Sequence, residues 1–389
     1  MKPTSQFGSI LIIAGTTIGA GMLALPLAAA GLGFGLAIGL MLLMWALMAY
    51  TALLMVELHH AAPRHASLHS LAHHFLGQSG QWLATFAMLF LFYALCSAYI
   101  AGGAEQLTGR LSSLLEKSTS STPIAVLFTL LIASLVALGT RSVDLVNRSL
   151  FALKIIALVL IFYLLLPEVK LTNLTTTPLT QGLVISALPI IFTSFGFHGS
   201  IPSVVRYLGK DIAALKRVIL AGSAIPLLIY CLWLMASQGT LAQSSLMAHP
   251  GLSAMLSQLA AEASQPIIGQ SINVFAELAL ATSFLGVSLG LFDFIQDMLK
   301  SNRLIASLAT FAPPLAFALF FPQGFILALG YAAIALVILA VYLPVAMVNA
   351  KRRQSHSNSQ YQVAGGKLGL VVAFIAGTVI IAAQLVSSV

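Results

Sequence analysis

The sequence predicts an all-α polytopic membrane protein, and three observations support this fold class. Of the 389 residues, 59% are hydrophobic and only 7% are charged, whereas a soluble domain carries about a quarter charged residues. Apolar runs long enough to cross a bilayer recur from one end of the chain to the other. Two of these runs are interrupted by glycine and small polar residues, at matching places in the two halves of the chain.

Eleven apolar runs reach the length of about 20 residues that a transmembrane helix requires. The expected spans are 7–30, 33–57, 82–106, 123–139, 147–166, 181–205, 215–236, 270–296, 303–321, 324–349 and 367–388. The first run follows Lys2 and lacks a small-residue cleavage site, so we expect it to be retained as a span. The connecting segments are too small for a catalytic domain. We expect a short surface helix within 58–81 and a solvated linker at 351–366.

The basic residues predict which side of the membrane each terminus faces. With a cytoplasmic N-terminus, the inside segments hold fourteen lysines and arginines and the outside segments three, which is a strong positive-inside signal. This count places the C-terminus outside, and it attributes the net charge of +8 to membrane topology rather than to a nucleic-acid partner. The inside residues are Lys2, Arg64, Arg141, Arg148, Arg206, Lys210, Lys216, Arg217, Lys300, Arg303, Lys351, Arg352, Arg353 and Lys367; the outside residues are Arg110, Lys117 and Lys170.

The two interrupted spans are the strongest pointer to function. The first interruption runs from Ala14 to Gly21 and the second from Phe192 to Ser200, and each is followed by a proline. Unwound backbone cannot face lipid, because each unpaired N–H or C=O group costs several kcal/mol there. A matching pair of interruptions is typical of secondary transporters that bind substrate near the bilayer midplane.

The first interruption offers groups for both ends of a zwitterion. A broken helix exposes carbonyls at the end of its first half, which suit an ammonium group or a cation, and N–H groups at the start of its second half, which suit a carboxylate. Gly15, Gly19 and Gly21 allow a ligand to approach the backbone closely, and Thr16 and Thr17 add hydroxyls. The alternative is a GxxxG helix-packing face formed by Gly15 and Gly19; the second interruption favours the binding interpretation.

The second interruption combines polar and aromatic side chains. Its polar groups are candidates for substrate contacts, and its phenylalanines are candidates for the wall of a flat apolar pocket or for gates. Phenylalanines that face lipid and a histidine that only packs are the alternatives. The polar candidates are Thr193, Ser194 and His198, and the aromatic candidates are Phe192, Phe195 and Phe197.

Ionisable residues inside the membrane are costly and mark functional sites. Lys154 lies in the middle of the fifth span, too deep to reach the interface easily, and is the candidate for loading and releasing a proton. Glu277 in the eighth span is the anionic candidate for partnering the substrate or Lys154. Glu105 and Asp293 lie near span ends, where snorkelling to the interface is the simpler explanation.

Two more polar residues complete the candidate site, and little points to other chemistry. Tyr99 in the third span is placed to close over a substrate, and Asn273 in the eighth is a further candidate contact. His69, His73 and His74 have a spacing compatible with metal binding, but a solvated surface is the favoured interpretation. The chain lacks paired carboxylates, a nucleophile triad and a phosphate loop. We therefore expect neither an enzyme nor a cofactor or metal site.

The broken spans also predict an internal repeat. Spans one to five (7–166) and six to ten (181–349) each open with a broken helix. An odd number of spans separates the two starts, so the halves have opposite topology within a single transporter domain. The span at 367–388 is then an addition.

Several stretches resemble the hydroxy/aromatic amino acid permease family, most strongly its tyrosine-specific branch. The resemblance runs over essentially the whole chain and is carried by residues 15–26, 45–54, 192–200, 279–287 and 313–320. It implies a LeuT-like five-plus-five inverted-repeat fold, in which broken helices bind the substrate. It also implies proton-coupled import across a bacterial inner membrane.

The resemblance assigns roles to individual positions. It implies that the N–H groups of Gly19, Ala20 and Gly21 bind the substrate carboxylate and that the carbonyls of Ala14, Gly15 and Phe192 receive its ammonium group. Lys154 matches a lysine that fills the place of a sodium ion in some proton-coupled relatives. The partner of a tyrosine hydroxyl is left open among Thr193, Ser194, His198 and Asn273.

These inferences predict a symporter of protons and aromatic amino acids, with L-tyrosine as the expected substrate. The alternative is a sodium-coupled or exchanging permease for other neutral amino acids. A channel or a membrane-embedded enzyme lacks the filter or the catalytic constellation that it would need. The expected partners are the small-molecule substrate, the proton and membrane lipid, and the sequence leaves the oligomeric state open.

Overall fold

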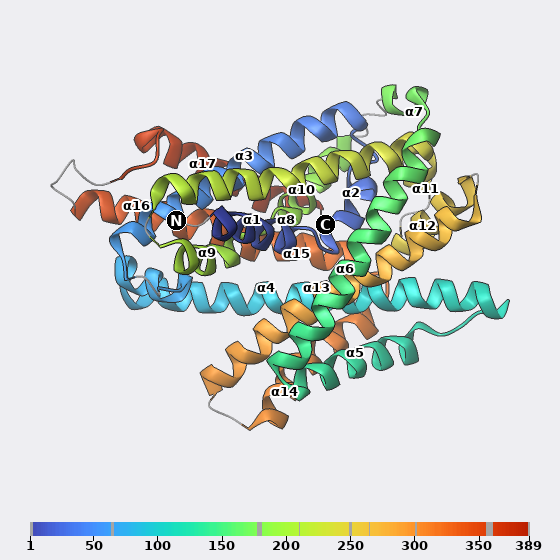
Figure 1. Cartoon of the computed structure of the whole chain (residues 1–389), viewed down its shortest axis with the longest axis horizontal. Coiled ribbons are helices and arrows are strands. Elements are labelled where there is room, and N and C mark those ends of the chain that lie inside the picture. The colour runs from blue at the N-terminus through green and yellow to red at the C-terminus, as the bar shows by residue number, and fades with distance from the viewer. Residues whose placement is uncertain are drawn as a thin grey trace.

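The computed structural model describes residues 3–63, 66–176, 181–209, 211–248, 251–263, 265–299, 302–354 and 361–387, which are helical almost throughout and contain no strand (Figure 1). Lys2, Arg64, Lys210 and Lys300, which contribute to the predicted orientation, lie outside these residues. The helices are α1 Pro3–Thr17, α2 Gly21–Ala28, α3 Phe34–Ala61, α4 Leu68–Leu115, α5 Ser121–Leu138, α6 Thr140–Leu165, α7 Leu171–Thr175, α8 Gln181–Ser194, α9 Ile201–Leu208, α10 Ile212–Thr240, α11 Gln243–Ala248, α12 Leu252–Glu262, α13 Pro266–Leu299, α14 Arg303–Phe320, α15 Phe325–Val337, α16 Leu343–Gln354 and α17 Gly366–Ser387. Short 3₁₀ turns cover Leu166–Glu168 and His198–Ser200, and a π-helical turn at Ile338–Tyr342 joins α15 to α16.

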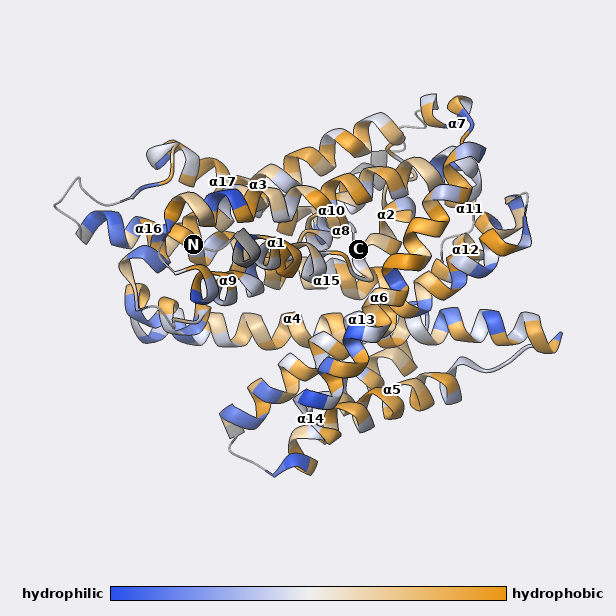
Figure 2. Cartoon of the chain, in the orientation of Figure 1, coloured by the Kyte–Doolittle hydropathy of each residue, from blue (hydrophilic) through white to orange (hydrophobic). Residues whose placement is uncertain are grey.

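The prediction of a polytopic helical membrane protein is confirmed. Among the described residues, ten helices are long and apolar enough to cross a membrane, or eleven if the bent pair of α1 and α2 is one span. Every predicted span coincides with one of them. Hydrophilic residues gather at the ends of the helices, and the lengths between are mostly hydrophobic (Figure 2). Large apolar side chains such as Leu43, Phe86 and Leu127 are exposed on the outer surface, as a lipid-facing surface requires.

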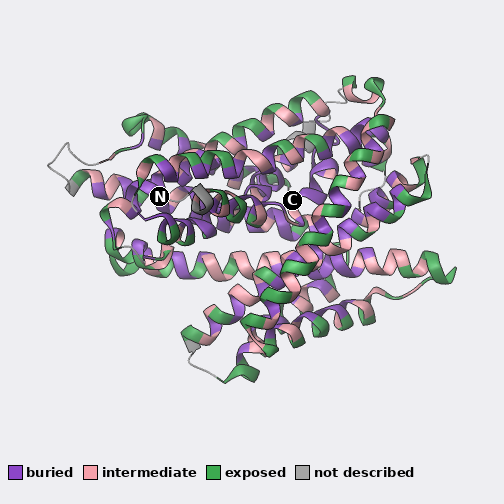
Figure 3. Cartoon of the chain, in the orientation of Figure 1, coloured by how far each residue is buried: buried purple, intermediate pink, exposed green. Residues whose placement is uncertain are grey.

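The helices pack in two groups. In one, α1 and α3 pack on α10, and α2 packs on α8. In the other, α4 packs against α5, α13 and α14. α6 crosses α13, and α15 lies between α4 and α8. Figure 3 shows that buried residues gather around α8 and α15, between these groups, and that the outer helices carry exposed residues along their outward sides. The inverted-repeat relationship between 7–166 and 181–349 remains a prediction.

Both predicted interruptions are breaks in the helical backbone. α1 ends at Thr17 and α2 begins at Gly21, and their axes differ by 54°. α8 ends at Ser194, and the chain becomes helical again only at His198. Glycine is required where the first break passes close to other segments: a Cβ added to Gly19 would lie 2.8 Å from Ser283 Oγ. Because α1 ends at Thr17, Gly15 and Gly19 do not lie on one helical face as the GxxxG alternative requires.

The segment between the second and third spans forms a short helix, as predicted. α3 continues to Ala61, and α4 begins at Leu68 behind a capping box formed by Ser67 and Ser70. The helix kinks at Gly77, where φ is 72°, a value that glycine adopts without strain. The residues before this kink form a separate short turn of helix at one end of the long membrane span.

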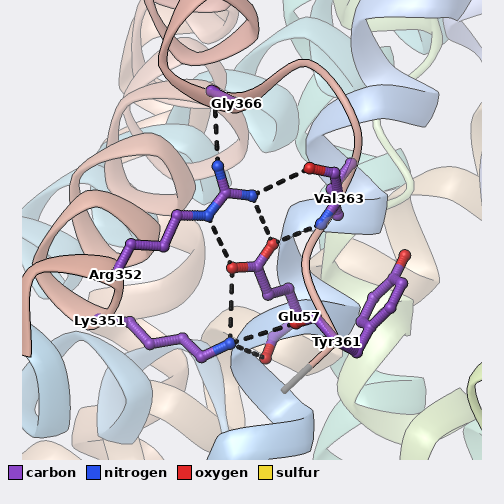
Figure 4. A network of polar contacts seen from close by, with 6 residues as sticks. All are labelled: Glu57, Lys351, Arg352, Tyr361, Val363 and Gly366. Atoms are coloured by element: carbon purple, nitrogen blue, oxygen red, sulfur yellow. Dashed lines mark hydrogen bonds and ion pairs between the residues drawn. The ribbon is translucent and has the colours of Figure 1, made fainter. Parts of the chain in front are cut away.

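The predicted solvated linker at 351–366 is partly wrong, because its first residues and its end are tied to a buried carboxylate (Figure 4). Glu57, near the end of α3, is fully buried. It accepts hydrogen bonds from Arg352 at 2.9 and 2.7 Å and from the Val363 N–H at 2.8 Å, and the Lys351 ammonium lies 3.4 Å away. The Arg352 guanidinium also donates to the Gly366 carbonyl at 3.4 Å. These contacts fix the start of α17 beside α3 and α16.

Candidate functional site

Lys154 on α6 is the one lysine that lies between the first break and α13 in the described part of the chain. Its side chain is 2% exposed. The ammonium donates to the Ile18 carbonyl at 2.9 Å and to Thr282 Oγ1 at 3.2 Å, and it lies 4.6 Å from the centre of the Phe151 ring. No described carboxylate lies within ion-pair distance of it. The charge is therefore balanced by dipoles and a ring, an arrangement that is costly to maintain inside a membrane.

The N–H side of the first break meets hydroxyls from two other helices. The Ala20 N–H donates to Ser283 Oγ on α13 at 2.9 Å. The Ser194 hydroxyl on α8 donates to the Gly21 carbonyl at 3.1 Å. A Cβ on Gly21 would lie 3.3 Å from the Ser194 backbone. Gly19, Ala20 and Gly21 thus lie where the two broken spans and α13 meet. The Ala20 N–H donates to a neutral hydroxyl, that of Ser283, which another acceptor could displace.

The carbonyl side of both breaks converges on one residue that sequence analysis missed. The Tyr230 hydroxyl on α10 lies 2.6 Å from the Thr17 carbonyl oxygen and 2.9 Å from the Ser194 carbonyl oxygen. The Ala14 carbonyl, an expected ammonium acceptor, already accepts from the Ile18 N–H at 2.9 Å. Tyr230 lies in an unbroken apolar run, so neither glycine nor charge marks it in the sequence.

The phenylalanines of the second break are inside the protein. Phe192 and Phe195 are fully buried and Phe197 is 1% exposed, so the lipid-facing alternative is wrong for all three. The Phe195 ring packs on the Tyr230 ring with centroids 5.3 Å apart. The Phe192 carbonyl accepts from the Phe195 N–H at 3.1 Å, a local turn that ends α8. Aromatic surface therefore surrounds the place where the carbonyl ends converge.

His198 and Thr193 connect the second break to neighbouring helices. His198 is 5% exposed, and its Nε2 lies 2.9 Å from Thr51 Oγ1 on α3. Its Nδ1 is buried without a hydrogen-bond partner among the described residues. The Thr193 hydroxyl lies 2.8 Å from the Pro189 carbonyl and 3.2 Å from the Leu329 carbonyl on α15. His198 Nδ1 is thus a buried polar atom available to a ligand.

The threonines of the first break use their hydroxyls locally. Thr16 is exposed, and its hydroxyl lies 2.9 Å from the Ile12 and Ile13 carbonyls of its own helix. The Thr17 hydroxyl donates to the Ile13 carbonyl at 2.7 Å. Gly15 faces the Phe151 ring, which would lie 3.5 Å from an added Cβ. The hydroxyls of this segment are thus used within α1, and its backbone groups are what it offers at the break.

Of the two partners expected for Glu277, the substrate and Lys154, the structure excludes a direct ion pair with Lys154, because Glu277 is paired with Arg110; a contact with the substrate stays a prediction. The Glu277 carboxylate is 2.6 Å from the Arg110 guanidinium on α4. One turn of α13 earlier, Asn273 accepts from Gln106 at 2.8 Å. The α4–α13 interface therefore carries a ladder of polar contacts on the N-terminal side of Thr282. Tyr99, on the same helix as Arg110, is buried with 7% of its surface exposed.

Two acidic residues near span ends have different surroundings. Glu105 accepts from the Ser253 N–H at 3.0 Å; it therefore caps the N-terminus of α12 rather than only reaching toward the interface. Asp293 is exposed, in line with the snorkelling interpretation. His69 is held by Gln81 and Thr85 at 2.6 and 3.1 Å. In the described ranges no group of three or more histidine, cysteine or acidic side chains is arranged to hold a metal ion.

Comparison with known proteins places these features in a family. The model of the tryptophan/tyrosine permease family matches residues 2–384. "Tyrosine-specific transport system 1" of Haemophilus influenzae is 44% identical over 96% of this chain and 94% of its own length. "Tryptophan-specific transport protein" of the same organism is 35% identical over 96% and 94%. "Glutamine transporter 2" of Aliivibrio fischeri is 34% identical over 97% and 99%.

The residues that the family model matches include both breaks and reach into the last span. These similarities confirm the resemblance to aromatic amino acid permeases and the expectation of a transport protein rather than an enzyme. They agree with the ten or eleven candidate spans that the described part of the chain contains. Because the family model covers nearly the whole sequence, this chain belongs to the tryptophan/tyrosine permease family.

Proposed function

We propose that this permease imports aromatic amino acids, with L-tyrosine as its preferred substrate, together with protons across a bacterial inner membrane. The observation that carries the coupling is Lys154: a buried ammonium with no carboxylate partner among the described residues donates directly to the Ile18 carbonyl in the first break. The aromatic substrate is supported by the relatives named for tyrosine and tryptophan transport. The positive-inside distribution supports a cytoplasmic N-terminus and a periplasmic C-terminus.

The two breaks are proposed to bind the backbone of the amino acid. The N–H groups of Gly19, Ala20 and Gly21 bind the carboxylate, which takes the place of the Ser283 hydroxyl at the Ala20 N–H. The carbonyls at the ends of α1 and α8 bind the ammonium group. This division follows the partial charges at helix ends, which are positive at the N-terminus and negative at the C-terminus.

The aromatic side chain is proposed to lie among the phenylalanines of the second break and under Tyr99. Burial of Phe192, Phe195 and Phe197 supports an aromatic pocket. The substrate hydroxyl has four candidate partners: Thr193, Ser194, His198 and Asn273. Of these, His198 is favoured by its buried Nδ1, which has no partner among the described residues.

Proton coupling is proposed to work through the contact between Lys154 and Ile18. A charged lysine pulls on the carbonyl that ends the first half-helix; a neutral lysine holds it less strongly. The position of the break is then linked to protonation, and linkage requires that the substrate and the proton affect each other's affinity equally. Glu277 lies on α13, the same helix as Thr282, and is paired with Arg110 on α4. It is the proposed second group on the proton's route.

The transport cycle is proposed to be alternating access in a LeuT-like five-plus-five repeat. The group of α1, α2, α3, α8 and α10 carries both breaks, and the group around α4 and α13 carries Glu277, Thr282 and Ser283. Rocking of one group against the other would open the site first to one side and then to the other. The contacts of Ile18 and Ala20 with α6 and α13 lie between the moving parts.

The second candidate is a sodium-coupled or exchanging permease for other neutral amino acids. The similarity to "Glutamine transporter 2" favours it, because that relative is named for a non-aromatic substrate. Lys154 argues against sodium, since an ammonium group held by a carbonyl and a hydroxyl repels a second cation at the same place.

Uptake into proteoliposomes separates the candidates. Labelled L-tyrosine is supplied with an inward proton gradient in sodium-free buffer, with unlabelled phenylalanine, tryptophan, leucine and glutamine as competitors. We expect accumulation that dissipation of the gradient abolishes, competition by the aromatic amino acids, and little effect of leucine or glutamine. Accumulation only with sodium, or stronger competition by glutamine, would favour the second candidate.

A further inference from the structure

Tyr230, in the second half of α10, contacts both broken spans at equivalent positions. Its side chain is fully buried. Its hydroxyl oxygen lies 2.6 Å from the Thr17 carbonyl oxygen and 2.9 Å from the Ser194 carbonyl oxygen. Thr17 is the last residue of α1, and Ser194 is the last residue of α8. One side chain from a third helix therefore holds the carbonyl ends of both half-helices.

This arrangement concentrates negative potential at one point. Each helix C-terminus carries about half a negative charge, and the two carbonyl oxygens would repel each other without a donor between them. A phenol has one proton to donate, so it satisfies the two acceptors only in part. The Phe195 ring, 5.3 Å from the Tyr230 ring, keeps the phenol in place. The remaining lone pairs suit a group with several N–H donors and a positive charge.

We propose that Tyr230 is a positioning residue for the α-ammonium group of the substrate. Its hydroxyl holds the ends of α1 and α8 together, so that their carbonyls converge on the place that the ammonium group occupies. Tyr230 acts on the substrate through Thr17 and Ser194 rather than by touching it. The Ser194 hydroxyl, which donates to the Gly21 carbonyl at 3.1 Å, links the same point to the start of α2. This inference rests on the proposed function, since it requires an amino acid substrate.

The test compares two ligands that differ only in the amino group. L-Tyrosine and 3-(4-hydroxyphenyl)propionate compete against labelled L-tyrosine in proteoliposomes that contain wild-type protein or Tyr230→Phe. The phenylalanine keeps the ring and removes the donor. We expect the affinity for L-tyrosine to fall about tenfold, because the hydrogen bonds of its ammonium group are weakened. The affinity for the desamino ligand should not change. An equal loss for both ligands, or no loss for L-tyrosine, overturns the assignment.

Tyr93→Phe is the matched control. Tyr93 also donates from a phenol to a backbone carbonyl, that of Ala309 at 2.8 Å, but it joins α4 to α14 away from the breaks. We expect this variant to leave the ratio of the two affinities unchanged. A Tyr93→Phe variant that lowers the ratio as much as Tyr230→Phe would show a general effect of removing phenols and would overturn the inference.

Tyr230→His is a second test variant, because it keeps a ring N–H donor. It is used if Tyr230→Phe does not reach the membrane or if the desamino ligand competes too weakly. We expect Tyr230→His to bind L-tyrosine better than Tyr230→Phe. If Tyr230→Phe cannot be measured, we expect Tyr230→His to show a measurable loss of affinity relative to wild type that is smaller than about tenfold. A histidine variant no better than phenylalanine, or indistinguishable from wild type when measured alone, contradicts the inference. Failure of the wild-type protein to take up L-tyrosine would instead contradict the proposed function.

Discussion

The Lys154 ammonium lies 2.9 Å from the carbonyl oxygen of Ile18, the first residue after α1 ends. The two residues are separated by 136 positions in the sequence. The contact places a titratable side chain on the backbone of the first break. A charge on α6 can therefore bias the geometry of the segment that is proposed to bind substrate.

Replacing Lys154 is expected to uncouple transport from the proton gradient. Lys154→Met keeps most of the apolar side chain and removes the charge, so the Ile18 carbonyl loses its donor. We expect exchange of L-tyrosine across the membrane to persist and its gradient-driven accumulation to disappear, both measured in proteoliposomes. Lys170→Met, at an exposed lysine, is the control and should accumulate substrate normally. Accumulation by Lys154→Met under a pH gradient would remove Lys154 from the coupling step.

Glycine at position 19 is expected to be essential because of Ser283. A Cβ at this position would lie 2.8 Å from Ser283 Oγ and 3.9 Å from Ser283 Cβ, so the hydroxyl is the principal obstacle. Gly19→Ala should reduce uptake at least tenfold, the effect of about 1.4 kcal/mol of misplacement. The double variant Gly19→Ala/Ser283→Ala should recover part of that loss in the same uptake assay. No recovery would mean that backbone strain, rather than this contact, is responsible.

Phe195 is expected to contribute to the preference for aromatic substrates. It is fully buried and packs on Tyr230. Phe195→Leu conserves most of the volume and removes the ring, and we expect it to weaken competition by L-tyrosine several-fold more than competition by leucine. Phe321→Leu, at an exposed ring on another helix end, is the control. Equal weakening of both competitors would show that Phe195 only supports the fold.

Glu57 is expected to be important for stability. Glu57→Gln leaves Arg352 and the 4%-exposed Lys351 without their counter-ion, and breaking a buried ion pair in this way costs about 3–5 kcal/mol. The unfolding temperature of the detergent-solubilised protein should fall clearly. Asp144→Asn breaks an exposed pair with Arg148 and should change it little.

A double replacement tests whether the unpaired charge of Arg352 causes the loss of stability in Glu57→Gln. Arg352→Met combined with Glu57→Gln removes both members of the closest pair, which lie 2.7 Å apart. The double variant should be more stable than Glu57→Gln alone, because a buried cation without a partner is costlier than a neutral side chain. A double variant that is less stable would place the contribution in the hydrogen bonds to Val363 and Gly366.

Much of this fold could be predicted because its signals are local. Hydropathy decides which segments cross a membrane, since each segment must satisfy its own backbone within the bilayer. The glycine-containing runs at Gly19 and Gly196 indicated both breaks for the same reason. Lys154 was predictable as a functional residue because a charge within an apolar run is costly wherever its partner lies.

The sequence by itself therefore determined the membrane class, the spans, the breaks and the family, all of which depend on runs of neighbouring residues. Only the tertiary structure decided the partners: Glu277 lies with Arg110 rather than Lys154, Tyr230 joins the two carbonyl ends, and Glu57 is buried with Arg352. These contacts join residues 167, 213 and 295 positions apart. They are set by which helices pack together, and the hydropathy of a single span is the same whichever neighbour its polar side chains meet.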